Sequence, residues 1–151
     1  MRKRNGYIGL GVMLVLGAAT VFGSDPLYRA IDSQNGGQTY TYLSPQADQN
    51  GFRDQVKMTI EEDTITGLTW DCVKEDGTKK SQLSMEGQYK MTENGLKWHE
   101  QAERVADYVL KNQSVEGLTG ADGYATDAVS AVSINLSGFV NGVNDCLSQA
   151  K

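Results

Sequence analysis

The sequence has little of the chemistry that hydrolytic enzymes and metal sites need. It contains one histidine, His99, and two cysteines, Cys72 and Cys146, which lie far apart along the chain. A structural zinc site needs four such ligands, and a serine or cysteine triad needs a histidine beside its nucleophile. Neither site is expected, and we expect His99 to be a solvent-facing helix residue. The sequence also lacks a Walker loop and the Rossmann glycine fingerprint.

The few cysteines and the many carboxylates leave some questions open. Cys72 and Cys146 could form one disulfide in an oxidising compartment, or they could be two small buried thiols. Carboxylates are plentiful, but none lies in an apolar sequence context that would indicate a tuned acid–base pair. Residues 61–63, all acidic, indicate a solvated turn rather than a cation site. A carrier or binding module is therefore favoured over a stand-alone enzyme.

Positive charge is concentrated at the start of the chain. Residues 2–4 are Arg-Lys-Arg, and residues 7–22 carry no charge. A basic segment, an apolar run and small residues around 17–24 are typical of a secretory signal. We expect residues 1–24 to be a cleaved signal peptide or, alternatively, an uncleaved membrane anchor, and the protein to be extracytoplasmic. Residues 25–35 indicate a linker, and residues 36–151 one domain.

The net charge of that domain restricts its partners. The whole chain has a formal charge of −5, and without residues 1–24 it has 11 basic against 19 acidic residues, a charge of −8. A domain this acidic repels nucleic-acid phosphates and anionic lipid surfaces. We expect no nucleic-acid partner, and membrane contact only through residues 1–24.

The hydrophobic pattern predicts an α+β fold. Tyr40 and Tyr42 alternate with threonines, which indicates a short strand. Apolar residues then alternate from 52 to 60 and again from 65 to 72, and the turn at residues 61–64 joins these runs into an antiparallel hairpin. The second run places Leu68, Trp70 and Cys72 on one face. The stretch 78–84 is polar, with no predicted element.

Two segments near the C-terminus have helical periodicity. Residues 98–113 place six apolar side chains on one face: Trp98, Ala102, Val105, Ala106, Val109 and Leu110. A second helix is predicted over residues 136–149, with Ser130, Ser133, Asn135 and Ser137 as candidates to cap it. We predict a small antiparallel sheet covered by two or more helices.

The segment Asp127-Ala128-Val129-Ser130-Ala131-Val132-Ser133 precedes the final helix. Small residues and hydroxyls leave the backbone open to close approach, and a helix N-terminus attracts anions. These features suit a phosphate group. From the residues alone, a capping loop with nothing bound is the alternative.

This segment resembles the signature of FMN-binding domains of exported bacterial redox proteins. Their pattern is Asp-x-x-Ser/Ala-Gly-Ala/Val-Thr/Ser, and its last hydroxyl receives FMN through a phosphoester bond. The similarity extends from about residue 36 to residue 148, including a Gly-x-Thr-Tyr opening at residues 37–40 and an Asp-Gly-Thr-Lys-Lys-Ser stretch at 76–81. This chain has alanine at 131 where the family usually has glycine, and serine where it more often has threonine.

The resemblance implies FMN as the cofactor and Ser133 as its covalent acceptor. It implies that Asp127 is the carboxylate recognised by the attaching flavin transferase, and that Ser130, Ala131 and Val132 line the phosphate loop.

Trp70, Tyr89, Trp98 and Tyr124 are candidates for packing near the flavin ring, and Tyr124, in the loop before the motif, is favoured over the two tryptophans. Trp70 and Trp98 lie on apolar faces and are expected in the core.

Three functional classes follow from these observations. The first is an electron-transfer flavoprotein outside the cytoplasmic membrane, with a membrane electron donor and a flavin transferase as partners. The second is a degenerate FMN-binding-like domain that binds another ligand or a protein at the cell surface. The third is a flavin-dependent reductase, which is disfavoured because no acid–base group is evident near the motif.

Overall fold

The computed structural model describes residues 36–91 and 93–151. The expected export signal, residues 1–24, and the expected linker, residues 25–35, lie outside the described residues. Within the described part of the chain, no helix is both long enough and apolar enough to cross a membrane.

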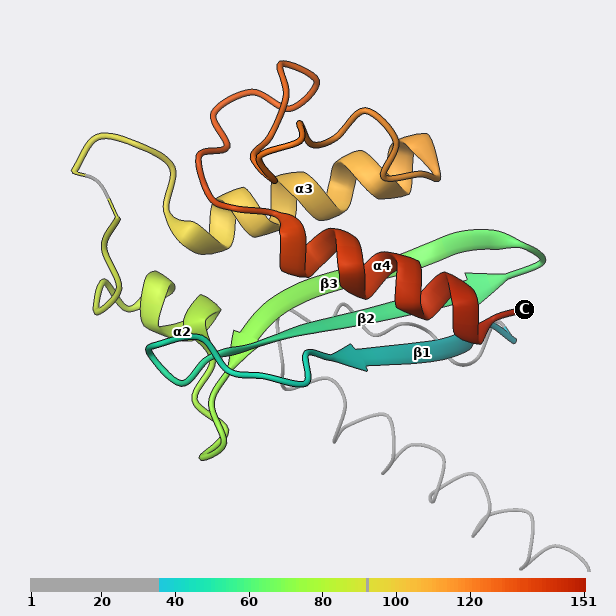
Figure 1. Ribbon diagram of the computed structural model, residues 1–151, viewed down its shortest axis with the longest axis horizontal. Coiled ribbons are helices and arrows are strands. Elements are labelled where there is room, and N and C mark those ends of the chain that lie inside the picture. Colours follow the sequence, from blue (N-terminus) through green and yellow to red (C-terminus); the bar gives the residue numbers. More distant parts are fainter. Residues whose placement is uncertain (1–35, 92) are drawn as a thin grey trace, which may run out of the picture.

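Three antiparallel strands form the sheet, in the order β1-β2-β3 (Figure 1). They are β1 (Gln38–Leu43), β2 (Arg53–Glu61) and β3 (Thr64–Val73). Glu62 and Asp63 form the turn between β2 and β3, with φ of 47° and 62°. Positive φ at both residues of a two-residue turn follows the twist of the flanking strands. The predicted hairpin is confirmed, with a tighter turn than residues 61–64, since Glu61 already pairs with Thr64.

One face of the sheet is covered by two helices, α3 (Trp98–Asn112) and α4 (Ser137–Gln149) (Figure 1). The α3 helix packs on β3, and α4 lies across β1 and β2. Gly142 lets α4 approach the sheet closely, because a side chain there would overlap Val56 and Tyr42. The α+β fold and both predicted helices are confirmed.

The core forms where the predicted apolar faces meet. Val56 and Met58 of β2, with Val105 and Val109 of α3, are completely buried. Leu68, Trp70 and Cys72 of β3 are buried together, as predicted. The Trp70 ring contacts those of Trp98 and Phe139, each with centroids 5.3 Å apart. Burial of such aromatic side chains contributes strongly to stability.

A short helix, α2 (Lys80–Met85), occupies part of the polar stretch that had no predicted element. Its buried residues are Lys80, Ser81 and Ser84, all polar, so it has no apolar periodicity to detect. Asp71, at the end of β3, holds its start: one carboxylate oxygen accepts the Ser81 N–H at 3.1 Å, and the other accepts the Ser81 hydroxyl. This anchor fixes α2 beside the end of the sheet.

Candidate functional site

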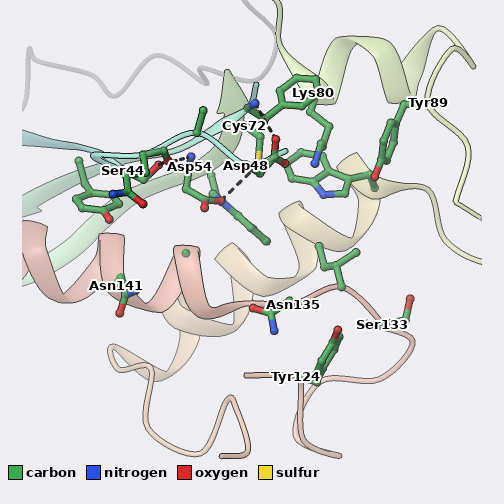
Figure 2. Close-up of a pocket in the computed structure, with 18 residues that line it drawn as sticks. Ser44, Asp48, Asp54, Cys72, Lys80, Tyr89, Tyr124, Ser133, Asn135 and Asn141 are labelled. Atoms are coloured by element: carbon green, nitrogen blue, oxygen red, sulfur yellow. Dashed lines mark hydrogen bonds between the residues drawn. The ribbon is translucent and has the colours of Figure 1, made fainter. Parts of the chain in front are cut away.

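A pocket of about 570 Å³ opens where β2 begins and β3 ends, beside the first turns of α3 and α4 (Figure 2). This volume lies within the range typical of small-molecule and cofactor sites. Its lining includes six aromatic side chains close to charged and hydroxyl groups. They are Tyr42, Phe52, Trp70, Tyr89, Trp98 and Tyr124. Both tryptophans are buried, as expected for core residues, and each also lines the pocket.

Two of the six predicted site residues line this pocket. Ser133 is exposed at its edge, and Tyr124 is 47% exposed in the loop beside it. In Figure 2, these two lie across the pocket from Lys80 and Tyr89. An accessible hydroxyl next to an aromatic-walled pocket can carry a covalently attached group that folds back into the cavity.

The other four predicted residues are outside the pocket lining. Asp127 and Ala131 are exposed, and Val132 packs against the core from the loop. The carbonyl oxygen of Ser130 accepts a hydrogen bond from the Arg104 guanidinium at 3.0 Å. Of the six predicted site residues, Ser133 and Tyr124 are therefore the two that line the cavity.

Ala131 has a left-handed backbone conformation, with φ of 60°. Glycine adopts this conformation without steric cost, whereas a side chain makes it unfavourable. Ala131 therefore has a left-handed backbone conformation at the position where the similar motif usually has glycine. Its side chain makes this conformation sterically strained, and glycine at this position would relieve the strain.

Gln101 of α3 holds the Ser133 loop in place, a role that the sequence reasoning missed. Its side-chain oxygen accepts the backbone N–H groups of Ser133 at 2.8 Å and Ile134 at 3.3 Å. Its Nε2 donates to the carbonyl of Leu96 at 3.0 Å and, over a longer 3.5 Å, to the Ser133 hydroxyl. Gln101 is only 2% exposed. The signal was present in the sequence, because Gln101 is a polar residue within the apolar face begun by Trp98.

Asp54 of β2 is a second residue that the sequence reasoning missed. Its Oδ1 accepts the indole N–H of Trp70 at 2.9 Å and the thiol of Cys72 at 3.4 Å. The carboxylate also lies directly against Gly138 in the first turn of α4, where a side chain would overlap it. A carboxylate at a helix N-terminus is electrostatically favourable. In the sequence, Asp54 lies between the apolar residues Phe52 and Val56 on the same face of the strand. This interruption of an apolar face could have indicated a buried polar role for Asp54.

Two carboxylates lie in partly apolar surroundings that their sequence context did not indicate. Asp54 lies beside Trp70 in the pocket wall. Asp71 is buried, and that burial raises the pKa of its carboxyl despite the hydrogen bonds from Ser81 and Cys72. Sequence neighbours alone do not indicate these surroundings. Strand pairing brings Asp54 beside Cys72, and α2 brings Ser81 against Asp71.

The start of α4 also differs from the expectation. Leu136 is its N-cap residue and makes no side-chain cap. The Asn135 side-chain oxygen instead accepts the Ser137 N–H at 2.9 Å. Of the four residues predicted as caps, Asn135 is the one whose side chain accepts a backbone N–H at the start of α4. It lies one residue before the N-cap residue, Leu136.

Cys72 and Cys146 are two separate buried thiols. Burial, reinforced by the negative charge of Asp54, raises the pKa of the Cys72 thiol. Burial, with a smaller effect of Asp145, raises the pKa of Cys146 to about 11. Both thiols are therefore protonated at neutral pH, and neither is an activated nucleophile.

His99 is half-buried rather than solvent-facing, because its Nδ1 lies 2.9 Å from the buried Ser84 hydroxyl. This contact joins α2 to α3, and His99 is not part of the pocket lining. Among residues 36–91 and 93–151, no three His, Cys, Asp or Glu side chains are grouped to hold a metal ion.

No family model and no curated protein matches the chain. A solution NMR structure of a protein from Clostridium thermocellum, a structural-genomics target, is 30% identical to it, with a TM-score of 0.56. The match covers 76% of this chain and 92% of that one.

Proposed function

We propose that this chain, which belongs to the same family as the Clostridium thermocellum protein, is an FMN-binding electron-transfer protein. The observation that carries the proposal is the placement of Ser133. Its exposed hydroxyl lies at the edge of an aromatic-lined pocket of about 570 Å³, on a loop held by Gln101.

The pocket suits a flavin in size and in wall chemistry. A flat, conjugated ring system packs well against aromatic side chains, and Tyr89 and Trp98 form part of one wall. Tyr124 is exposed on the loop side and can cover a bound ring. When bound, FMN supplies reversible electron transfer, and the protein supplies position and electrostatic environment.

Ser133 is the proposed attachment point. A flavin transferase with a flavin dinucleotide as donor would form a bond between the serine Oγ and the FMN phosphorus. The phosphoanhydride bond of the donor breaks in the same step, AMP leaves, and the serine proton passes to a base of the transferase. The chain's own contribution is to present Ser133, and the positive φ of Ala131 supports the resemblance to the family's glycine-containing loop.

The proposal includes export, with residues 1–24 as the targeting segment and a membrane-bound electron donor as partner. The strongly acidic composition fits neither nucleic acid nor an anionic membrane as a binding surface. The alternative function, a flavin-dependent reductase, needs an acid–base group near the flavin, and Asp54 places a carboxylate in the pocket wall. Its two hydrogen bonds to Trp70 and Cys72 favour a structural role instead.

The proposal is tested by titrating the purified full-length chain with FMN and following the quenching of flavin fluorescence. Tyr89→Leu removes a ring from the pocket wall and should weaken binding about tenfold, since stacking contributes about 1–1.5 kcal/mol. Tyr108→Leu is the matched control, because Tyr108 is also half-buried but hydrogen bonds to the Glu116 carbonyl outside the pocket lining. Absence of saturable quenching with the wild-type chain would favour the degenerate binding module.

A further inference from the structure

Lys80 is a buried cation that faces the pocket. It is 8% exposed at the first position of α2, and its ammonium lies over three aromatic rings. The distances from Nζ to the ring centroids are 4.8 Å for Phe52, 5.1 Å for Tyr89 and 5.6 Å for Trp98. No carboxylate forms an ion pair with it among residues 36–91 and 93–151. Figure 2 shows its side chain directed toward the cavity beside Tyr89.

A buried ammonium without an anionic partner is energetically unfavourable. The faces of three aromatic rings offset part of that cost through cation–π attraction. The Asp71–Ser81 hydrogen bonds fix the start of α2, so the backbone that carries Lys80 cannot readily move toward solvent. The fold thus holds one ammonium at the cavity wall without an ion pair to a described residue.

The carboxylates of the pocket lining make hydrogen bonds with other groups. Among the described residues that line the pocket, Lys80 is the one basic residue, and Asp48 and Asp54 are the acidic ones. Asp48 accepts the N–H groups of Asn50 and Phe52. Asp54 accepts the indole N–H of Trp70 and the Cys72 thiol. The carboxylates are engaged in local hydrogen bonds, while the ammonium is available to a ligand.

We propose that Lys80 contacts the edge of the bound flavin ring that becomes negatively charged on reduction, and that its charge raises the reduction potential. This inference rests on the proposed function. A bound flavin would accept two electrons from an external reductant, such as dithionite, and one proton from water. Its reduced ring would then carry a net negative charge, and Lys80 would supply the nearby positive charge. A fixed cation favours this form over the neutral oxidised form.

The test measures the midpoint potential of the FMN-loaded chain by dithionite titration against a reference dye, together with the dissociation constant of oxidised FMN. Lys80→Met removes the charge and keeps an unbranched side chain of similar length. It should weaken binding of reduced relative to oxidised FMN by about 10- to 100-fold. For a two-electron couple this lowers the midpoint potential by about 30–60 mV. Lys80→Arg keeps the charge and should stay close to the wild-type potential.

Lys74→Met is the matched control, because the Lys74 ammonium lies 4.9 Å from the Phe52 centroid but is not part of the pocket lining. It should leave the potential unchanged. Lys80→Gln gives a second neutral variant if Lys80→Met does not fold. Unchanged potentials in a folded neutral Lys80 variant would overturn the inference and leave the proposed function standing. A wild-type chain that binds no FMN would overturn both.

Discussion

Replacing Gln101 with methionine should release the Ser133 loop while leaving the rest of the fold in place. Methionine matches glutamine in length but cannot accept the N–H groups of Ser133 and Ile134, or donate to the Leu96 carbonyl and the Ser133 hydroxyl. The three shorter hydrogen bonds contribute about 1 kcal/mol each, and the one to the Ser133 hydroxyl, at 3.5 Å, contributes little. Because the exposed end of the loop can bond to water instead, the expected loss in the free energy of unfolding is about 2 kcal/mol.

Gln113 provides a chemically matched control at the other end of the sheet. Its side chain accepts the Ile65 N–H at 2.7 Å and donates to the carbonyls of Ile65 and Leu110. Gln113→Met also removes three hydrogen bonds and should cost a similar free energy of unfolding, about 2–3 kcal/mol. It leaves the contacts of the Ser133 loop intact.

Urea unfolding and native-state amide hydrogen exchange separate the two variants. In Gln101→Met the Ser133 and Ile134 amides should exchange at least tenfold faster, while the amides of β2 and β3 decrease in protection only as global stability falls. In Gln113→Met the loop amides should follow the global change alone. Equal exchange of Ser133 in both variants would refute the conclusion that Gln101 holds this loop.

Two further substitutions test the backbone strain and the buried carboxyl. Ala131→Gly should raise the free energy of unfolding by about 0.5–1 kcal/mol, because relief of about 1–2 kcal/mol of left-handed strain exceeds the entropic cost of glycine; destabilisation in urea would contradict the strain. Asp71→Asn can keep all three hydrogen bonds if the Ser81 hydroxyl becomes the acceptor. Because burial raises the pKa of folded Asp71 above its ordinary 3.8, the folded state binds this proton more tightly than the unfolded state. The wild type should therefore lose stability relative to Asp71→Asn as the pH rises from about 3.8 through that raised value. A wild-type free energy of unfolding that stays constant or rises with pH relative to that of Asp71→Asn, in parallel urea titrations, would contradict the sign.

Elements with a regular apolar pattern could be predicted from the sequence. The hairpin of β2 and β3 and the helices α3 and α4 each bury one periodic face against the same core. The α2 helix could not be predicted, because it buries polar residues such as Ser81 and Ser84. Its stability comes from Asp71 and His99, which are distant in the sequence.

The site could be predicted only in part. Ser133 and Tyr124 were identified from the motif and its preceding loop, and both line the pocket. Gln101 and Asp54 interrupt apolar faces, and such interruptions are a readable sign of a buried polar role. The position of Lys80 in the pocket could not be predicted from its neighbours in the sequence, because the rings around it come from separate segments of the chain.

The central claim is that this chain carries FMN on Ser133 beside the pocket. The most direct measurement is the intact mass of the full-length chain expressed in an exporting host with a flavin transferase, followed by peptide mapping. The account predicts an added mass of FMN less one water on the peptide that contains Ser133. That mass should be lost in Ser133→Ala and retained in Ser130→Ala. Ser130 is a matched serine of the same loop, and its carbonyl and its hydroxyl both accept from Arg104, outside the pocket lining. An unmodified wild-type chain, or flavin that persists in Ser133→Ala, would contradict it.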